Sequence, residues 1–360
     1  MGKIIIADLE LDFELIKTGK WPTHPPYFEA ALAFCHHYLN GQRVFQLHTS
    51  GSTGIPKSIQ VNRQQMQASA KATGDFFSIP ENADLLGCLN IEMIGGKMML
   101  VRAMEWNANL YLFEPSANPL AAVPKRQSFS FGAMVPMQLA ASIENADAYE
   151  KLLLIKNLII GGAPPNRELQ EKAASLPIQI YQTFGMTETV SHVALAKIKK
   201  EEDLVYSALP GVLFSQTVEG KLLINSPMSN PAEILTNDVV ELLSETSFIW
   251  KGRADFTINS GGVKLQPEVI ENQLAELIES LFPGSRYFVF GREDKTLGQK
   301  VCLLIEESAE AGKKAEVLLK EIKVLISRYA APKKVYFLAT FVETASGKVN
   351  RPATIEKLTT

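Results

Sequence analysis

The chain has 360 residues, of which 46% are hydrophobic and 21% are charged. Because single hydrophobic cores stop growing at about 250–300 residues, we expect two domains in an ordinary globular protein. The balance of 36 Lys and Arg against 39 Asp and Glu gives a net charge of -3. Since the charges form no long run of one sign, they indicate neither a nucleic-acid nor a membrane partner.

Cysteine usage and the N-terminus bear on the cellular compartment. Cys35, Cys88 and Cys302 are widely spaced and form no C-x-x-C pair, which favours a reducing cytoplasm over a disulfide framework. The apolar run at residues 4–6 is too short for a signal peptide, and no stretch approaches the roughly 18 apolar residues of a spanning helix. We therefore expect a cytoplasmic protein without a membrane anchor.

Residues 40–185 alternate short β-rich runs with longer stretches that are typical of helices, which predicts a layered α/β domain with a largely parallel sheet. The predicted strands cover residues 43–47, 84–89, 109–113, 128–134, 157–160 and 178–183. Further strands at residues 222–225, 234–237, 239–242 and 247–251 predict a small β subdomain that ends near Gly252.

The remaining chain predicts a compact α+β unit. Pro267 occupies the first position of a helix that reaches about Leu281, and strands are expected at residues 287–290 and 300–305. A second amphipathic helix follows from the apolar positions Ala315, Leu318, Leu319, Ile322, Leu325, Ile326 and Tyr329. We therefore expect an N-terminal domain over residues 1–252 and a C-terminal domain over residues 253–360.

Residues 49–57 concentrate hydroxyls, glycines and one lysine between a predicted strand and a helix that begins near Asn62. Glycines allow backbone N–H groups to approach an anion, hydroxyls add donors, and Lys57 adds a positive charge, so the segment suits a triphosphate. It is not a Walker-type loop, because Pro56 precedes the lysine. A surface turn is the alternative. The candidate phosphate ligands are Thr49, Ser50, Gly51, Ser52, Thr53, Gly54 and Lys57.

This loop resembles the T-S-G-[ST]-T-G-x-P-K signature of the adenylate-forming superfamily, which comprises acyl-CoA synthetases, adenylation domains and luciferases. Matching companions follow in order: GGAP at residues 161–164, FGMTE at 184–188, TND at 236–238, GRAD at 252–255 and SGKVNR at 346–351. The resemblance covers about residues 44–351. It implies that a carboxylic acid is activated with ATP and Mg²⁺ and then transferred to the CoA thiol.

The resemblance also assigns site residues. It implies that Gly162, Ala163 and Phe184 contact the adenine, and that Asp238 and Arg253 bind the ribose. Asn237 replaces the usual Gly of the segment that contains Asp238.

Three further roles follow from the same motifs. Thr187 and Glu188 would supply hard oxygen ligands for Mg²⁺. Lys348 would be the catalytic lysine, and Asp255 the hinge between the domains.

Residues 185–191 and 258–262 are similar to those of the o-succinylbenzoate-CoA ligase family of menaquinone biosynthesis, which implies that acid as substrate. Another aryl or acyl acid, a carrier-protein thiol as acceptor, or a non-catalytic nucleotide-binding relative are the alternatives. The phosphate loop lies close to the start of the chain, so we expect most of the family's usual N-terminal subdomain to be missing or reduced. The sequence predicts no oligomeric state.

Two cations are candidates for substrate binding. Met93 stands where the family has a histidine, so the gating role of that residue does not transfer. Lys97 and Arg102, on or near the following helix, are candidates to bind the second carboxylate of a dicarboxylic acid. The alternative is that both lie on an exposed helix face. His36 and His37 are adjacent on a predicted helix and cannot share a face, so we expect no transition-metal site there.

Overall fold

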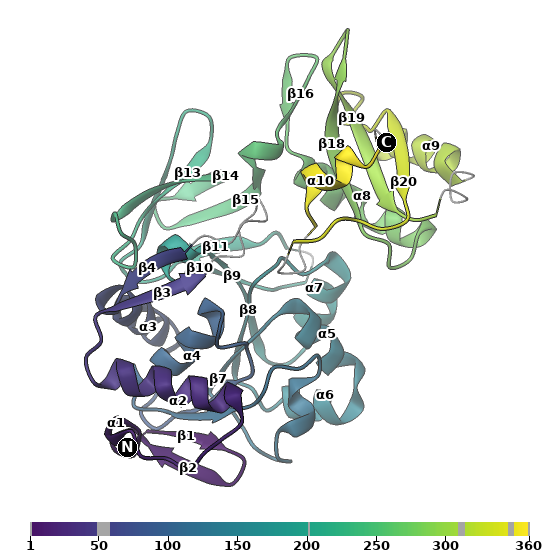
Figure 1. Ribbon diagram of the computed structural model, residues 1–360. Helices are drawn as coiled ribbons and strands as arrows, with labels where there is room; N and C mark the ends of the chain where they lie inside the picture. The colour runs from purple at the N-terminus through teal and green to yellow at the C-terminus, as the bar shows by residue number, and fades with distance from the viewer. Residues whose placement is uncertain (1, 49–57, 201, 309–313, 345–348, 359–360) are drawn as a thin grey trace.

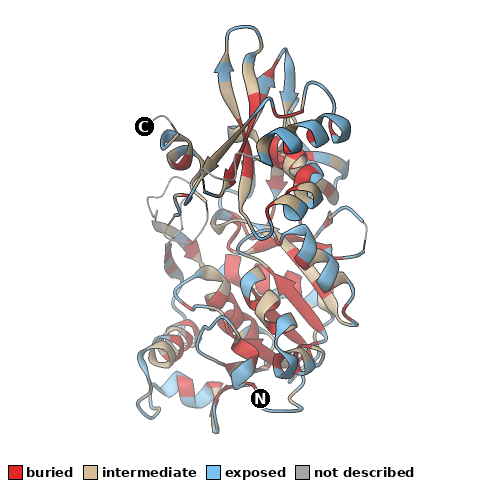
Figure 2. Cartoon of the chain, turned by 90° about the vertical axis from the view of Figure 1, so that its right-hand side faces the viewer, coloured by how far each residue is buried: buried red, intermediate tan, exposed pale blue. Residues whose placement is uncertain are grey.

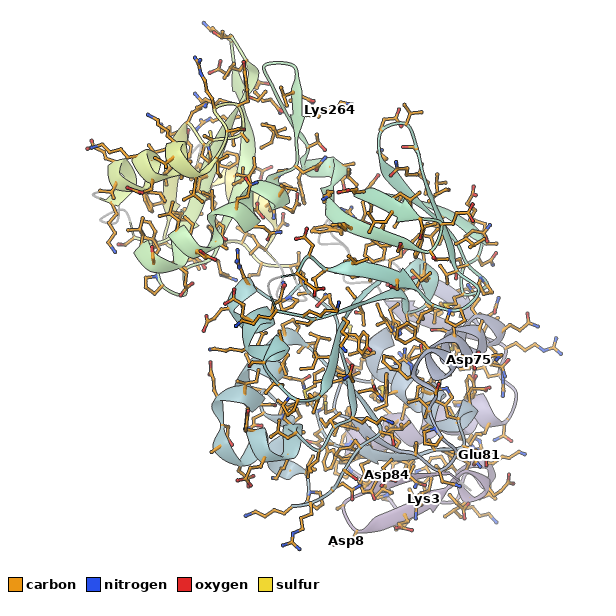
Figure 3. All side chains as sticks on the ribbon, turned by 180° about the vertical axis from the view of Figure 1, so that it is seen from behind. Lys3, Asp8, Asp75, Glu81, Asp84 and Lys264 are labelled. Carbon is orange, nitrogen blue, oxygen red and sulfur yellow. The ribbon has the colours of Figure 1, made fainter. Side chains whose placement is uncertain are left out.

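The structure is a computed structural model, and it describes residues 2–48, 58–200, 202–308, 314–344 and 349–358. Figure 1 shows a large part that contains the N-terminus and a smaller part that contains residues after about 258. Lys264 lies at the opposite end of the molecule from Lys3 and Asp84 (Figure 3). Among these residues, no helix is both long and apolar enough to cross a bilayer.

One sheet organises the large part. Within the described chain it has 13 strands in the order β12-β13-β14-β15-β11-β10-β9-β8-β7-β5-β6-β1-β2. Its parallel centre consists of β1 (Lys3–Ile6), β6 (Asn109–Leu112), β5 (Asp84–Gly87), β7 (Phe131–Met134), β8 (Asn157–Ile160) and β9 (Gln179–Gly185). The antiparallel strands are β2 (Leu9–Asp12), β10 (His192–Lys197), β11 (Val205–Ala208), β12 (Leu213–Gln216), β13 (Lys221–Asn225), β14 (Glu233–Ser244) and β15 (Ser247–Arg253). The predicted α/β fold is confirmed, and the pairing is parallel from β1 to β9, whereas the remaining neighbours in the sheet are antiparallel.

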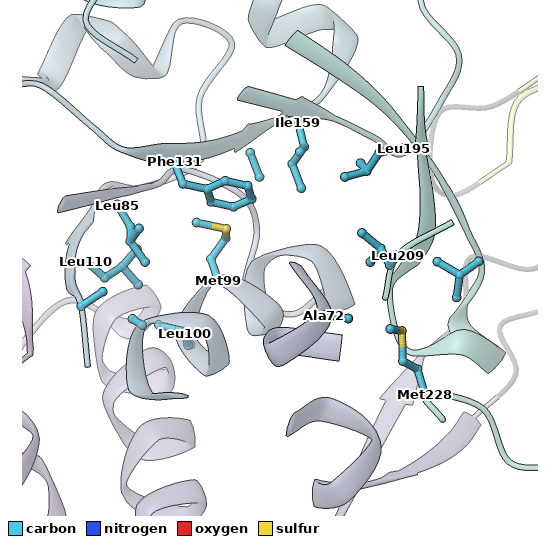
Figure 4. Packing of buried hydrophobic residues seen from close by; sticks show 14 of the residues in the cluster. Ala72, Leu85, Met99, Leu100, Leu110, Phe131, Ile159, Leu195, Leu209 and Met228 are labelled. Carbon is cyan, nitrogen blue, oxygen red and sulfur yellow. The ribbon is translucent and has the colours of Figure 1, made fainter. Parts of the chain in front are cut away.

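Helices cover both faces of the parallel centre (Figure 2). Leu85 belongs to the core that packs on α2 (Pro26–Leu39), α3 (Arg63–Phe77) and α4 (Ile94–Glu105), as Figure 4 shows for Met99 and Leu100. Its neighbour Leu86 belongs to the core on the other face. That face is covered by α5 (Pro136–Glu144), α6 (Ala146–Leu152) and α7 (Arg167–Ala174). Because both faces are buried, these strands are continuous apolar runs. The short helix α1 (Phe13–Thr18) and the 3₁₀ turn η1 (Pro119–Ala122) complete this part.

Two expectations for the large part are wrong. The strand predicted at residues 43–47 is β3 (Val44–His48), which pairs only with β4 (Ser58–Asn62) in a separate two-stranded sheet. Its inward residues Phe45 and Leu47 pack with Met66 of α3 and Met98 of α4, so helix contacts replace sheet contacts. The two strands predicted at 234–242 are the single strand β14.

The predicted β subdomain is continuous with the large sheet. Val205 of β11 pairs with Ile249 of β15, and this pairing joins the parallel centre to β12–β15. The hydrophobic residues at this junction, including Tyr206 and Phe248, belong to the same core as Leu85. The region is therefore an extension of the main sheet.

The C-terminal part has its own sheet and its own buried clusters, which contain residues from 258 onward. The turn η3 (Ala254–Phe256) leads into β16 (Ile258–Ser260), β17 (Val263–Leu265), α8 (Pro267–Leu281), β18 (Tyr287–Asp294), β19 (Gly298–Glu306), α9 (Ala315–Leu325), β20 (Lys334–Leu338) and α10 (Arg351–Glu356). Helix α8 has the predicted bounds. Helix α9 ends earlier than predicted, because Ile326 is extended and Tyr329 is exposed.

Candidate active site

The parallel strands β8 and β9 bring two of the sequence motifs together. Ile160 pairs with Gln182, so the turns that follow both strands lie at the same carboxyl edge of the sheet. The Thr183 hydroxyl donates a 3.1 Å hydrogen bond to the carbonyl of Ile160. Gly162 has a φ of +86°, a conformation in which glycine is favoured over other residues. The main chain at residues 161–163 is thereby held beside β9.

Phe184, near the end of β9, is half-buried. Its ring packs edge-to-face on Tyr206 and Phe248, with centroid distances of 5.6 and 5.0 Å. These contacts fix the ring at the junction between the parallel and antiparallel halves of the sheet. Its contact with adenine stays a prediction.

The candidate metal ligands Thr187 and Glu188 lie in the 3₁₀ turn η2 (Thr187–Thr189), where Glu188 is exposed. The buried Thr189 fixes this turn. Its hydroxyl oxygen accepts a 3.0 Å hydrogen bond from the Met186 N–H and lies 2.9 and 2.7 Å from the carbonyl oxygens of Met186 and Ser191. Thr189 was not among the predicted site residues, although its place directly after Thr187 and Glu188 was a usable signal.

The turn ends in a strained residue. Val190 has a φ of +65°, which is rare for a β-branched residue and costs of the order of 1–3 kcal/mol. Hydrogen bonds on both sides enforce this conformation: Val190 N–H donates to Thr187 at 2.9 Å, and Ser191 N–H donates to Thr189 at 2.7 Å. The fully buried Val190 side chain packs in the same cluster as β3 and β4. The turn that carries Glu188 is therefore fixed to the strands that flank residues 49–57.

Asp238 and Arg253 are opposite one another on β14 and β15. Arg253 Nη1 lies 3.8 Å from Asp238 Oδ2, and Arg253 Nη2 donates a 2.7 Å hydrogen bond to Asp255. The Trp250 indole donates a 2.9 Å hydrogen bond to Asp238 Oδ1. Burial raises the pKa of Asp238, while Trp250 and Arg253 act in the opposite direction and Asp255 adds to the rise. Trp250 was not among the predicted site residues, although it lies only three residues before Arg253.

Arg102 is 1% exposed, so the alternative that it lies on an exposed helix face is wrong. Its Nη2 donates to Ser191 Oγ at 3.2 Å and lies 3.5 Å from His192 Nδ1, while its guanidinium faces the ring of Phe131 at 5.7 Å. Arg102 Nε has no hydrogen-bond partner among the residues that the structure describes. Within that same set, Arg102 forms no ion pair. Burial lowers the pKa of Arg102 to about 9, which leaves it charged at neutral pH.

Among the residues that the structure describes, no carboxylate pairs with Arg102. His192 is buried between Arg102 and Thr73, whose hydroxyl lies 3.2 Å from His192 Nε2. Burial, together with the charge of Arg102, lowers the pKa of His192 well below its usual value, so this imidazole is neutral at pH 7. A buried cation next to neutral groups is costly unless an anion is bound beside it.

Lys97 does not join Arg102. It is half-buried near the start of α4, and its Nζ donates a 3.1 Å hydrogen bond to the carbonyl of Glu92. Burial lowers its pKa, and Glu92 partly offsets that effect. The structure thus separates the two cations that the sequence analysis paired.

Several predicted site residues lie outside the described part of the chain: Thr49, Ser50, Gly51, Ser52, Thr53, Gly54, Lys57 and Lys348. The segments next to them are described. Leu47 pairs with Ile59 in the β3–β4 ladder, and Asn62 caps α3 by accepting from Gln65 N–H at 2.8 Å. The predicted helix start at Asn62 is confirmed.

The chain is thus an α/β protein in which the turns that carry residues 161–163 and 187–188 lie at the carboxyl edge of the sheet, the edge at which proteins of this class bind their ligands. Residues 39–226, just over half of the chain, match the model of the family described as AMP-binding enzyme. The chain belongs to this family.

Two curated relatives carry the name of one activity. A probable 2-succinylbenzoate–CoA ligase from Mycobacterium tuberculosis is 26% identical over 336 residues, which cover 86% of this chain and 83% of that protein. A 2-succinylbenzoate–CoA ligase from Bacillus mycoides is 23% identical over 334 residues, which cover 85% of this chain and 68% of that protein.

Solved structures share the fold. An acyl-CoA synthetase (AMP-forming)/AMP-acid ligase II-like protein from Dyadobacter fermentans is 42% identical, with a TM-score of 0.65 and coverage of 96% of this chain and 98% of that chain. The O-succinylbenzoate coenzyme A synthetase from Bacillus subtilis, in complex with ATP and magnesium ion, is 20% identical with a TM-score of 0.71. That match covers 86% of this chain and 69% of the Bacillus chain, and at this identity it shows a common fold.

Proposed function

We propose that the protein is an ATP-dependent acid-CoA ligase whose preferred acid is o-succinylbenzoate. A carboxylate oxygen of the acid attacks the α-phosphorus of ATP, and the bond to pyrophosphate breaks. The CoA sulfur then attacks the acyl carbon and AMP leaves. Membership of the AMP-binding family supports the ligase class, and the names of the curated relatives support the acid.

The buried Arg102 is the observation that carries the choice of acid. Its guanidinium is charged, has an unpartnered Nε and pairs with no carboxylate in the described residues. A dicarboxylic acid supplies the missing anion, because one carboxylate is activated while the other pairs with Arg102. Ser191 and His192 would complete the polar lining. We propose that Lys97, which lies near the start of α4 and apart from Arg102, has at most an accessory role toward the acid.

The nucleotide would lie along the carboxyl edge of the sheet. The acceptor Asp238 and the forked donor Arg253 match the hydrogen bonding of a ribose diol. We propose that Gly162, Ala163 and Phe184 border the adenine, and that residues 49–54 together with Lys57 bind the phosphates.

Thr187 and Glu188 offer hard oxygen ligands that fit Mg²⁺, and Glu188 is exposed as such a ligand must be. When bound, Mg²⁺ offsets negative charge on phosphate oxygens. The hydrogen bonds of Thr189 hold both candidate ligands in one turn.

We propose that the C-terminal domain predicted over residues 253–360 brings Lys348 to the site by rotation about Asp255, while Arg253, which ends β15 before this hinge, stays with the main sheet. The separate hydrophobic clusters of residues after 258 support this boundary. Lys348 would stabilise charge that develops during adenylate formation.

The direct test combines purified protein, Mg²⁺-ATP and o-succinylbenzoate, with and without CoA, and follows pyrophosphate, AMP and thioester by mass spectrometry. We expect thioester formation, and loss of the adenylate in Lys348→Ala. Release of pyrophosphate with a different acid would keep the class and reject the substrate. ATP binding without turnover across a panel of acids would reject the ligase class.

The acid-binding residues need a separate test. Arg102→Ala and, to a smaller extent, Lys97→Ala are expected to raise the KM for o-succinylbenzoate while the KM for ATP stays within about twofold. Benzoate, which lacks the second carboxylate, is the control substrate, and its KM should not respond to Arg102→Ala. An unchanged KM for o-succinylbenzoate in both variants would contradict the assignment.

A further inference from the structure

Glu268, the second residue of α8, makes a close contact across the proposed hinge. It is 8% exposed, and a Cβ atom placed on Gly252 would lie 2.4 Å from Glu268 Oε2. That oxygen has no hydrogen-bond partner among the described residues. Gly252 belongs to β15, before Asp255, whereas Glu268 lies after it. The absence of a side chain at residue 252 is what lets this carboxylate approach the strand.

Arg351 connects the same carboxylate to the segment that carries Lys348. Its Nη1 lies 3.7 Å from Glu268 Oε1, and its Nη2 donates a 2.9 Å hydrogen bond to Glu271 Oε2. The guanidinium also faces the ring of Phe256 in the turn η3 at 5.0 Å. Arg351 begins α10, three residues after Lys348. We call Gly252, Phe256, Glu268, Glu271 and Arg351 the hinge cluster.

The hinge cluster contains two buried carboxylates and one guanidinium. Burial raises the pKa of Glu268 to about 7, and the neighbouring Glu271 adds to the rise, while Arg351 and the backbone N–H groups of Glu268 and Arg253 oppose it. Glu271 is satisfied by the Val289 N–H at 2.7 Å in addition to Arg351. The charged groups that face Glu268 are therefore Glu271 on its own helix and Arg351 from α10.

Within the described part of the chain, the other elements of the hinge cluster contribute no further charged side chain that acts on Glu268. On β15, the guanidinium of Arg253 is directed to Asp238 and Asp255, so only its backbone acts on Glu268. The turn η3 contributes the uncharged ring of Phe256. A single proton on Glu268 therefore decides whether the cluster has a net charge of zero or of minus one.

We propose that Glu268 is a positioning residue that stabilises the domain orientation seen here when its carboxyl group is protonated and releases the C-terminal part when it ionises. The proposal rests on the proposed function in one respect, the rotation about Asp255. Gly252 and Glu268 lie on opposite sides of Asp255, so rotation separates them. Glu268 is then hydrated, whereas Phe256, Glu271 and Arg351 all lie after Asp255 and move together with it.

The direction of the pH effect follows from linkage. Because the carboxyl group binds its proton more tightly in this orientation than in water, low pH favours this orientation and rising pH favours the other. With a pKa of about 7 here and about 4.5 when hydrated, the ratio of the two orientations changes about tenfold between pH 6 and pH 8.

The test measures the orientation directly by energy transfer between dyes on two introduced cysteines, Lys71→Cys in α3 and Val324→Cys in α9. Both positions are exposed, and the native Cys35, Cys88 and Cys302 are buried. In the otherwise wild-type chain, we expect the transfer efficiency to change between pH 6 and pH 8 as rising pH depopulates the orientation seen here. Glu268→Gln should keep the pH 6 value throughout, because its amide is neutral.

Two further variants make the test specific. Glu276→Gln is the matched control, since Glu276 lies on the same helix and also pairs across the hinge, with Arg167 at 2.9 Å, but both groups are exposed. It should respond to pH as the parent does. Gly252→Ala should show the opposite behaviour to Glu268→Gln and keep the pH 8 value, because its Cβ excludes the Glu268 carboxylate.

Each outcome decides the proposal independently of catalysis. Thermal unfolding at pH 6 and pH 8 identifies any variant that does not fold, and the other variant then carries the test. A pH response in Glu268→Gln equal to that of the parent, or a parent without a response, would overturn the proposal. If o-succinylbenzoate is not a substrate, the transfer measurement is unaffected, so failure of the proposed function is distinguished from failure of this inference.

Discussion

The indole nitrogen of Trp250 donates a 2.9 Å hydrogen bond to Oδ1 of Asp238, across two neighbouring strands of the main sheet. This bond fixes one oxygen of the carboxylate and leaves Oδ2 on the side of Arg253. It also opposes the effect of burial on the pKa of Asp238, so it helps to keep the carboxylate ionised. Trp250 thereby orients the acceptor that we propose for the ribose.

Trp250→Phe should weaken ATP binding about tenfold, because hydrogen bonds to charged groups contribute about 1.5–3 kcal/mol and the Asp238 carboxylate loses its fixed orientation. Calorimetric titration with ATP measures the change. Trp21→Phe is the matched control, since Trp21 donates a comparable 3.1 Å bond to Glu29, on α2. Equal ATP affinity in the two variants would show that Trp250 is only a packing residue.

Arg102→Met should weaken binding of a dicarboxylic acid at least tenfold while leaving the free energy of unfolding unchanged or increased. Acid binding is expected to weaken because the carboxylate loses its cation. Stability is not, because the guanidinium is buried without an acidic partner in the described residues, whereas a methionine of similar length has no charge to bury. Thermal unfolding and the KM for the acid measure the two effects.

Arg63→Met supplies the contrast to Arg102→Met. Arg63 donates to the carbonyl of Tyr38 and lies over its ring at 4.2 Å, so its loss should destabilise the protein by about 1–2 kcal/mol. The KM for the acid should not change in this variant. A large loss of stability in Arg102→Met would instead indicate that the arginine has an internal partner.

Thr189→Val should lower the free energy of unfolding by about 1–3 kcal/mol and reduce the Mg²⁺-ATP-dependent release of pyrophosphate, because the turn around Glu188 loses its hydroxyl bonds. Chemical denaturation and a pyrophosphate assay measure these effects. Thr217→Val is the comparison, since its hydroxyl accepts from Glu219 N–H in the turn between β12 and β13. That variant should lose some stability and keep its activity; a fully active Thr189→Val would remove the role assigned to the turn.

The stability of the protein should fall as the pH drops below about 6.5, in part because of His192. The folded protein holds this imidazole neutral, with a pKa well below the usual value, whereas the unfolded chain binds a proton near pH 6.5. The unfolded state therefore binds more protons, and stability falls by up to about 1.4 kcal/mol per pH unit. Denaturation of His192→Gln between pH 7 and pH 5 should give a flatter profile. His37→Gln, at an exposed position, should follow the wild-type profile.

Local sequence signals predicted those elements whose ends are set by nearby residues. Asn62 and Gln65 form the capping box of α3, and Pro267 opens α8 at the predicted position. The pairing of strands that are distant in the sequence was not predictable from such local signals. The strand at residues 43–47 has the composition of the sheet strands, but its partner β4 and the helices beneath it decide where it lies. Helix α9 ends at Leu325 although its apolar spacing continues to Tyr329, which is exposed.

The residues of the candidate site show the same difference between short-range and long-range features. The motifs identified Asp238 and Arg253 as a pair because they are short-range features of two adjacent strands. Burial of Arg102 depends on contacts with Ser191 and His192, about 90 residues away. A signal was present all the same, since Arg102 is the one charged residue in the apolar run at 98–104. Lys97 and Arg102 are five residues apart on α4, a spacing that places them on different sides of a helix, so their separation was predictable from the sequence.

The pairing of β9, β10, β11, β15 and β14 has a mechanical consequence for the proposed reaction. Phe184, Asp238 and Arg253 all lie on strands of one hydrogen-bonded sheet, so the adenine and the ribose of the nucleotide would be held by one rigid element. A nucleotide bound there would stay fixed to the main sheet throughout turnover. The C-terminal part would move relative to the main sheet. It would present different surfaces to the bound nucleotide in turn, while the nucleotide stays in place.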